Sequence, residues 1–254
     1  MRNIKFTLAY DGTDYYGWAI QPNLPTIQGT VVDVLEKITQ EQIRLHGCGR
    51  TDAGVHALGQ VAHCKIRSTI PAENLQRALN SLLPPTIRVT EAKEVPRGFH
   101  ARWHAEAKTY RYRIVRAPLC PPFVWRYVYH YPFSLDTAAV RRALPAFIGE
   151  HDFTSFSSWA SEHDEGKNKV RTVLSAELTK LDANQELVFT IRGRAFLRHM
   201  VRKIVGTLLE VGKGKLAESD IASILAARDR TRSGPTVPAS GLCLLSVDYP
   251  ERFR

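Results

Sequence analysis

The first hundred residues alternate between strand-like and helix-like patterns of apolar side chains. Residues 3–10 place Ile4, Phe6 and Leu8 on one face of a strand, because alternate side chains of a strand point the same way. Apolar residues at helical spacing then predict a helix over 26–42. Further elements are expected as short strands at 43–46 and 61–66, a helix from Pro71 and a strand at 87–95. The predicted order is β-α-β-β-α-β.

The remainder of the chain mixes the same two patterns. Strands are predicted at 108–114, 173–179, 187–193 and 242–249. Helices are predicted over 138–149, from Phe196 to Val211, and over 219–228. Pro145 weakens the later turns of the first of these helices, because proline has no N–H to donate. Residues 151–169 are rich in Ser, Asp and Glu and predict a polar loop.

The order of these elements indicates the α+β class. Strands and helices alternate without the regular βαβ units of a doubly wound sheet, so two α+β halves with largely antiparallel mixed sheets are expected. The boundary is predicted near residue 105. This gives an N-terminal domain at 1–105 and a C-terminal domain at 106–254.

Composition supports a globular chain and excludes several classes. A chain of 254 residues with 44% hydrophobic residues is large enough for a sizeable core, which excludes disorder and collagen-like repeats. No apolar run reaches the roughly 18 residues of a membrane span, and no secretory signal opens the sequence. The 4 cysteines form no CxxC pair, so reduced thiols are expected. Together these features favour a soluble, cytoplasmic protein.

Charge adds a candidate partner. The net charge is +10, and 24 of the 35 basic residues are arginine. The guanidinium group binds phosphate oxygens through two parallel hydrogen bonds and stacks on bases, so an excess of arginine favours nucleic acid as the partner. A basic protein without a polyanionic ligand remains the alternative.

The densest group of special residues is the segment 47–56. Its glycines surround Arg50 and Asp52 in a loop between strands, and glycine lets the backbone come close to a ligand. A carboxylate held there beside an arginine is suited to act as a nucleophile or base. Alternatively, Asp52 only satisfies backbone N–H groups of a tight turn. The spacing alone leaves both readings open.

Other constellations carry less chemistry. The histidines and cysteines of the first hundred residues lack the paired spacing of a zinc site, so no metal is expected. The segment 212–215 lacks the span and the Ser/Thr of a phosphate-binding loop. Glycoside hydrolysis normally requires two acids at a defined separation, and Asp52 has no evident second acid.

The Asp52 segment also resembles a known family. Gly49-Arg50-Thr51-Asp52-Ala53-Gly54-Val55-His56-Ala57 is similar to the catalytic loop of the TruA family of tRNA pseudouridine synthases. The resemblance extends along the whole chain in the same order. Its other blocks are Tyr10-Asp11-Gly12-Thr13, Tyr16-Gly17-Trp18, Thr26-Ile27-Gln28-Gly29, Phe99-His100-Ala101-Arg102, Lys108-Thr109-Tyr110-Arg111-Tyr112, His151-Asp152-Phe153, the segment 196–206 and Pro238-Ala239-Ser240-Gly241-Leu242.

The resemblance implies a fold and an activity. The fold is that of the pseudouridine synthases, with a central basic cleft between the two halves. The activity is isomerisation of uridine to pseudouridine at positions 38, 39 and 40 in the anticodon arm of tRNA. The resemblance further implies a homodimer that needs neither a metal nor an organic cofactor. The alternative is a module on the same scaffold that binds or folds tRNA, with or without catalysis.

The resemblance also assigns site residues. Asp52 takes the place of the catalytic aspartate, as nucleophile or base, and Tyr110 that of the tyrosine that stacks on the base. Arg202 takes the place of the basic residue that pairs with the aspartate, although Arg198 lies one predicted helical turn away. A tyrosine that only packs in the core is the alternative for Tyr110. Arg50 and Leu242 are expected to contact the substrate.

Basic residues cluster around the predicted strand at 108–114. A target uridine must leave the base stack, and phosphate contacts on either side of it offset that cost. Each of these side chains is otherwise an ordinary solvated cation. The candidates for tRNA contact are Arg102, Lys108, Arg111, Arg113 and Arg198.

Overall fold

The computed structural model describes residues 1–158, 168–181 and 185–253, and these residues group into two units. The first unit contains Met1–Lys108 together with Cys243–Arg254, and the second contains Thr109–Leu242. The end of the chain, which the sequence analysis assigned to the second half, therefore belongs to the first unit. The reason is a parallel strand pairing, in which Cys243 lies opposite His56.

The first unit is built on a mostly antiparallel sheet. Its strands lie in the order β4 (Ile87–Val95), β1 (Arg2–Tyr10), β3 (His56–Ile66) and β10 (Leu242–Asp248), with β2 (His46–Gly47) pairing with β3. β1 is antiparallel to both β3 and β4, whereas β10 runs parallel to β3. The strands predicted at 3–10 and 87–95 are confirmed within one residue.

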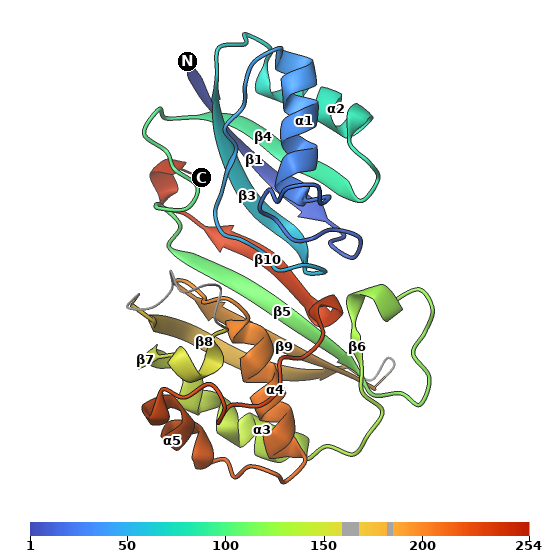
Figure 1. Cartoon of the computed structure of the whole chain (residues 1–254), viewed down its shortest axis with the longest axis vertical. Helices are drawn as coiled ribbons and strands as arrows, with labels where there is room; N and C mark the ends of the chain where they lie inside the picture. The colour runs from blue at the N-terminus through green and yellow to red at the C-terminus, as the bar shows by residue number, and fades with distance from the viewer. Residues whose placement is uncertain (159–167, 182–184, 254) are drawn as a thin grey trace. The chain divides into compact units, whose positions relative to one another are not determined.

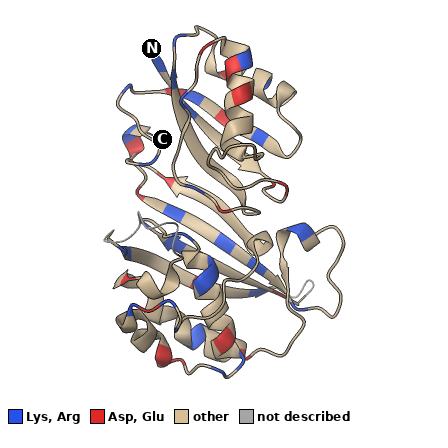
Figure 2. Ribbon diagram, in the orientation of Figure 1, with Lys and Arg blue, Asp and Glu red and all other residues tan. Residues whose placement is uncertain are grey.

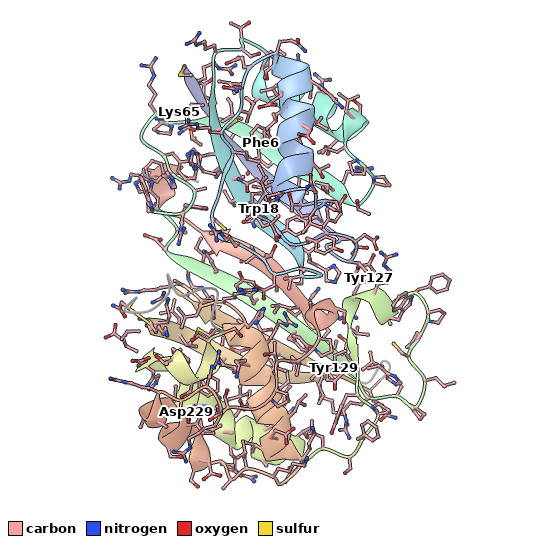
Figure 3. The ribbon with its side chains drawn as sticks, viewed as in Figure 1. Phe6, Trp18, Lys65, Tyr127, Tyr129 and Asp229 are labelled. Atoms are coloured by element: carbon pink, nitrogen blue, oxygen red, sulfur yellow. The ribbon has the colours of Figure 1, made fainter. Side chains whose placement is uncertain are left out.

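Two helices of the first unit, α1 (Ile27–Thr39) and α2 (Ala72–Leu82), lie on one face of this sheet (Figure 1). α1 begins where the sequence predicts, because the Thr26 side chain accepts a hydrogen bond from the Gly29 N–H and caps the helix. Ile4, Phe6 and Leu8 are fully buried, as the period-two pattern of β1 predicts. Figure 3 labels Phe6 within this core.

A cluster of imidazoles lies at β2 and β3 of the first unit. His46 and His63 stack with ring centroids 5.1 Å apart, and His100 contacts His63 at 4.7 Å. The Nδ1 atom of His63 accepts a hydrogen bond from the Ala101 N–H at 3.2 Å, which requires that nitrogen to be unprotonated. Burial, together with the neighbouring His100 and His46, lowers the pKa of His63 to about 4.

The second unit also contains a group of paired strands. Its strands lie in the order β5 (Ala107–Val115), β9 (Glu186–Gly193), β8 (Val170–Leu181) and β7 (Gly149–Asp152), with β6 (Tyr129–His130) pairing in parallel with β5. β8 is antiparallel to both β7 and β9. The helices of this unit are α3 (Thr137–Ala143), α4 (Met200–Gly212) and α5 (Asp220–Ala227). Both units combine helices with largely antiparallel strands, so the α+β prediction is confirmed.

Two predicted helices of the second unit differ from the structure. The helix expected over 138–149 is α-helical only to Ala143 and continues as one 3-10 turn over Leu144–Phe147, in keeping with the missing N–H of Pro145. The helix expected from Phe196 begins at Met200 instead. His199 precedes it in the left-handed conformation, with φ of 61°, and this ends the preceding segment.

The polar loop expected over 151–169 is partly wrong. Its first residues belong to β7, and Phe153, Ser155 and Phe156 are fully buried. The sequence does not predict this strand, because β7 has no alternation of apolar residues and forms by pairing with β8. Residues 159–167 of the predicted loop lie outside the described residues.

The first unit also contains two smaller differences. The strand predicted at 61–66 begins five residues earlier, at His56, because residues 57–60 pair with the end of β1. The strand predicted at 43–46 is reduced to the two residues of β2. In the described part of the chain, no helix combines the length and the apolar character needed to cross a membrane.

The imidazole cluster predicts a pH-dependent stability. The ordinary pKa of 6.5 for His63 falls to about 4 in the fold, so the stabilisation is complete above pH 6.5 and is lost as the pH falls toward 4. We expect this residue alone to lower the free energy of unfolding by about 2 kcal/mol between pH 7 and pH 5. Urea titrations at both pH values measure it. The glutamine of His63→Gln cannot titrate, so the fall in the free energy of unfolding from pH 7 to pH 5 should be about 2 kcal/mol smaller in this variant than in the wild type. An equal fall in both proteins would contradict the assignment.

Candidate active site

Asp52 lies in a tight turn that leads into β3. The Val55 N–H donates to the Asp52 carbonyl oxygen at 3.1 Å, and Gly54 adopts a φ of 76°, which favours glycine. The Asp52 side chain is partly exposed, whereas Thr51 and Val55 on either side of the turn are buried. The turn therefore holds a partly exposed Asp52 between buried neighbours.

The loop over residues 11–18 seats this turn through backbone contacts. The Trp18 N–H donates to the Thr51 carbonyl oxygen at 3.1 Å, and the Gly54 N–H donates to the Tyr15 carbonyl oxygen at 3.2 Å. Gly17 has a φ of 87°, and a Cβ atom there would lie 2.6 Å from the Thr51 oxygen. Only glycine permits this approach without displacing the backbone.

A buried hydrogen-bond network lies beneath the turn. The Tyr10 hydroxyl contacts the Thr51 hydroxyl at 2.9 Å and accepts from the Gln60 side chain at 3.3 Å. The same Gln60 amide donates to the Gly49 carbonyl oxygen, and its oxygen accepts from the Cys48 thiol. Burial raises the pKa of both Tyr10 and Cys48, so each keeps its proton and remains a donor.

Two basic residues accompany this turn in the first unit. The Lys108 ammonium donates to the Cys48 carbonyl oxygen at 2.8 Å, and a Cβ atom at Gly49 would lie 2.8 Å from the same nitrogen. Burial lowers the pKa of Lys108. Arg50 is exposed. The lysine thus supports the start of the loop, and Arg50 projects from it.

Tyr110 lies on the buried face of β5 in the second unit. Its side chain is 8% exposed and contacts Phe196 edge to face, with ring centroids 5.1 Å apart. Tyr112 and Ile114 continue the same buried face, as the alternation predicts. The edge contact with Phe196 holds the Tyr110 ring in one orientation.

Arg202 lies in the first turn of α4. Its Nε atom donates to the Val237 carbonyl oxygen at 2.7 Å, which fixes one edge of the guanidinium. Arg198 precedes the helix, is exposed, and accepts a hydrogen bond from the Ser158 N–H through its backbone oxygen. The prediction that Arg198 lies one helical turn from Arg202 is therefore wrong, because the helix starts after His199.

The segment over residues 237–242 accepts hydrogen bonds from both α4 and β5. The Tyr112 hydroxyl donates to the Pro238 carbonyl oxygen at 2.8 Å, one residue from the oxygen that Arg202 contacts. A Cβ atom at Gly241 would lie 2.6 Å from the Tyr112 ring, so glycine is required there. Leu242, the next residue, is 5% exposed. The segment thus contains Leu242 and fixes the guanidinium of Arg202.

The basic residues of β5, visible as blue bands in Figure 2, have different surroundings. Arg113 forms a two-pronged ion pair with the buried Glu186, at 2.5 and 2.8 Å. The Nε atom of Arg111 is buried and has no hydrogen-bond partner among the described residues. Arg102, just before the strand, is exposed. Their contacts with RNA stay predictions, and Arg113 already has a structural partner.

The site residues thus divide between the units. The first unit contains Asp52, Arg50 and Lys108, and the second contains Tyr110, Arg202 and Leu242. Sequence reasoning did not assign the supporting roles of Tyr10 and Gln60 beneath the turn. The sequence carries no signal for the role of Gln60, because this residue lies just before the strand predicted at 61–66 and its complete burial is a property of the fold.

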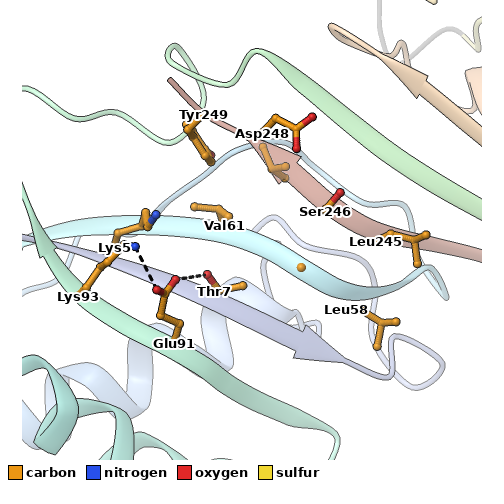
Figure 4. Close-up of a pocket in the computed structure, with 12 residues that line it drawn as sticks. Lys5, Thr7, Leu58, Val61, Glu91, Lys93, Leu245, Ser246, Asp248 and Tyr249 are labelled. Carbon is orange, nitrogen blue, oxygen red and sulfur yellow. Dashed lines mark hydrogen bonds and ion pairs between the residues drawn. The ribbon is translucent and has the colours of Figure 1, made fainter. Parts of the chain in front are cut away.

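A separate cavity of about 450 Å³ lies on the first unit and contains none of the predicted site residues (Figure 4). Among its polar groups, Glu91 pairs with Lys93 at 3.1 Å and accepts from the Thr7 hydroxyl at 3.2 Å. The Lys5 ammonium donates to the carbonyl oxygen of Phe253, which lies outside the lining. Nowhere in residues 1–158, 168–181 and 185–253 do three or more His, Cys, Asp or Glu side chains form a group that could hold a metal.

Comparison with known proteins finds one family along most of the chain. The profile of the family described as "tRNA pseudouridine synthase" matches residues 7–104 and 143–250. The chain is 50% identical to "tRNA pseudouridine synthase A" of Solibacter usitatus over 249 residues, which cover 98% of this chain and 100% of that protein. It is 45% identical to the protein of the same name from Caldicellulosiruptor saccharolyticus, with the same coverage of both chains.

Among solved structures, a similarity extends to the "Crystal Structure of a Cbf5-Nop10-Gar1 Complex". The identity is 11%, the match covers 94% of this chain and 57% of that chain, and the TM-score is 0.37. This likeness is too distant to support an inference about the present site.

The contact at Gly17 predicts a strong effect of one methyl group. Gly17→Ala should lower the free energy of unfolding by about 1–3 kcal/mol, because alanine is strained at a φ of 87° and its Cβ meets the Thr51 oxygen. Urea denaturation measures the change. Gly98→Ala is the matched control, since a Cβ there has no atom within 4 Å and should change stability little. Equal stability of the two variants would show that the 11–18 loop does not seat the turn.

Proposed function

Because the chain belongs to the tRNA pseudouridine synthase family, it isomerises uridine to pseudouridine in tRNA, and we propose that its targets are the uridines at positions 38, 39 and 40 of the anticodon arm. The family match covers both units, including the turn of Asp52 and the helix of Arg202. The choice of positions rests on the resemblance of the sequence blocks to the TruA family. The observation that carries the catalytic part is the rigid seat of Asp52.

The reaction requires little beyond a positioned carboxylate. The C1′–N1 bond breaks, a C1′–C5 bond forms, the C5 hydrogen leaves as a proton, and N1 gains one. No electron is transferred overall. Attack on the sugar, attack on the base and removal of a sugar proton all begin with the same ionised carboxylate. We assign this role to Asp52.

The support for Asp52 is structural. Its turn is tied to the 11–18 loop by two backbone hydrogen bonds, at Thr51 and Gly54, and rests on the buried Tyr10 hydroxyl. A carboxylate on a rigid, preformed turn loses little freedom when the substrate binds, which lowers the barrier of the chemical step.

Tyr110 and Arg202 complete the proposed site. The edge contact with Phe196 fixes the Tyr110 ring, so that a flat surface is ready for the detached uracil. The bond from Arg202 to the Val237 oxygen occupies Nε and leaves the terminal NH₂ groups as further donors of the guanidinium. We propose that they pair with the Asp52 carboxylate and keep it ionised.

The remaining basic residues are proposed to hold the tRNA backbone. Arg111 is favoured over Arg113, because its buried Nε lacks a partner among the described residues whereas Arg113 pairs with Glu186. Arg50, Arg102 and Arg198 are exposed and are suited to phosphate contacts, with Lys108 at the base of the same loop as Arg50. Leu242 is proposed to line the pocket of the base.

The assembly and location are also proposals. We propose a homodimer in the cytoplasm, without metal or organic cofactor. The exposed apolar side chains of Leu119, Phe123 and Phe133 are of the kind that a second copy covers. All four cysteines, at 48, 64, 120 and 243, are free thiols, which agrees with a reducing compartment.

Tritium release tests the proposed function. With tRNA labelled at C5 of the uridine at position 38, 39 or 40, the wild-type protein should release tritium with chelator present, because joining the sugar to C5 expels that hydrogen. Asp52→Asn should reduce the rate at least 1,000-fold, on the order of the loss when a catalytic carboxylate is neutralised. Thermal unfolding confirms that the variant is folded.

The controls separate the components of the proposal. A tRNA labelled only at uridines outside positions 38–40 should release none, and release from it would contradict the choice of positions. Tight tRNA binding without release by the wild-type protein would favour the binding or folding module instead. Release by folded Asp52→Asn at the wild-type rate would remove Asp52 from the reaction.

Arg202→Ala tests the proposed partner of Asp52. The single-turnover rate at saturating tRNA should fall about 100-fold or more, while tRNA affinity falls less than 10-fold, because the lost contact is to the carboxylate and not to the backbone of the RNA. Arg111→Ala is the comparison: it should weaken tRNA binding and reduce the slope of log K against log salt by about 1. A near-wild-type single-turnover rate in Arg202→Ala would reject the pairing.

A further inference from the structure

An exposed indole is held in place on the first unit. Trp103 is 78% exposed, and its ring stacks on the His100 imidazole with centroids 3.8 Å apart and planes 11° from parallel. One face of the indole is therefore covered by a neighbouring ring, and the high exposure leaves the other face open to solvent. Burial of a large apolar ring is energetically favourable. An exposed tryptophan held in one orientation therefore points to a ligand that covers it.

Backbone hydrogen bonds hold the segment that carries this stack. The Nδ1 atom of His100 accepts from the Arg102 and Trp103 N–H groups, at 3.2 and 3.4 Å, and His104 accepts from the His100 N–H at 2.9 Å. Burial lowers the pKa of His100, as do His46, His104 and Arg102, so the ring stays a neutral acceptor at neutral pH. The indole is thus presented on a turn with little conformational freedom.

The core of the first unit anchors the same segment from below. Phe99 is 1% exposed and contacts the Tyr249 and Phe253 rings, each with centroids 5.2 Å away. The Tyr249 hydroxyl donates to the Ala101 carbonyl oxygen at 2.6 Å. These contacts tie the turn to the end of the chain, so the orientation of Trp103 is set by the fold.

The surroundings of the stack are basic. Arg102, next to Trp103 in sequence, acts on the charge of His100, and Lys65, labelled in Figure 3, acts on that of His63. Both side chains are exposed, and so is Arg97 at the start of the segment. Glu106 is an exposed acid four residues after Arg102. Cations around an open aromatic face form the arrangement that binds a nucleobase together with its phosphates.

We propose that Trp103, stacked on His100, is a platform for an unpaired nucleobase of the tRNA substrate. A base within a paired stem already has neighbours on both faces, whereas an unpaired base can place one face on the indole. A second copy of the chain or another protein would not require the surrounding cations. The ligand in this proposal rests on the proposed function, in that it is the same tRNA.

The platform is a positioning site, separate from the Asp52 turn. His63, which contacts His100, lies seven residues after His56 along β3, or roughly 23 Å of strand. The Asp52 turn lies immediately before His56. A base held on Trp103 is therefore several nucleotides distant from one held at Asp52, and its binding sets where the RNA lies and not how the bond breaks.

Three variants test the platform. Trp103→Ala should weaken the binding of full-length tRNA about 5- to 100-fold, the effect of losing one base–aromatic stack. KM for tritium release should rise in parallel, with a much smaller change in kcat. Trp103→Phe keeps a flat ring and should stay within about threefold of wild type. Trp125→Ala removes an exposed tryptophan of the other unit and is the matched control, expected to change affinity less than twofold.

Fluorescence gives a readout that a structural role does not change. A base stacked on the indole should quench tryptophan emission when tRNA binds, and the quenching should be much smaller in Trp103→Phe. Thermal unfolding of Trp103→Ala should match wild type within a few degrees, because the side chain is mostly exposed.

Three results would overturn the platform. These are wild-type affinity in folded Trp103→Ala, equal losses in the Ala and Phe variants, or a changed oligomeric state with unchanged tRNA affinity, which would make this face a protein interface. If the wild-type protein binds tRNA but releases no tritium, the proposed function fails. Binding and quenching still decide the role of Trp103 in that case.

Discussion

The turn that carries Asp52 lies so close to the 11–18 loop that a single methyl group at Gly12 would lie 2.0 Å from the Val55 carbonyl oxygen. The proposed chemistry depends on this contact, because the backbone of the turn sets the place from which the Asp52 carboxylate extends. The buried hydroxyl of Tyr10 and amide of Gln60 support the turn from the other side. Polar groups at such a position are costly unless all are paired, and here they pair with the loop itself.

The second unit also depends on a close backbone contact at a glycine. A Cβ atom at Gly206 in α4 would lie 1.8 Å from the Pro235 carbonyl oxygen, so the following segment packs directly against the helix backbone. Thr207 accepts a hydrogen bond from the Gly234 N–H and secures it. This close packing brings the Val237 oxygen to Arg202. In both units, therefore, glycine contacts between backbones position a charged side chain that is proposed to act on the substrate.

The positive charge of the chain has several distinct uses. Arg113 neutralises the buried Glu186, and Lys108 contacts the Cys48 carbonyl oxygen, so both stabilise the fold. Arg102 is exposed beside the Trp103 stack, where a cation is suited to an RNA phosphate. A count of basic residues indicates a polyanionic partner, but only the surroundings of each side chain separate structural cations from those that face solvent.

The sequence by itself determined the α+β class, the strands at 3–10 and 87–95, the start of α1 near residue 26, and the segment that holds Asp52. These features follow from local rules, since period-two and helical patterns, caps and glycine-rich turns involve neighbours in the chain. The family blocks added the candidate residues Tyr110 and Arg202, whose spacing carries no chemical signal.

Only the tertiary structure decided where α4 begins, that 243–254 joins the first unit, and which groups support the Asp52 turn. β7 forms by pairing with β8, and Gln60 and Tyr10 meet across two strands. The partner of Arg113 is 73 residues away in sequence. Such contacts join residues that are distant in the chain, and their free energy depends on burial and geometry that a one-dimensional pattern does not contain.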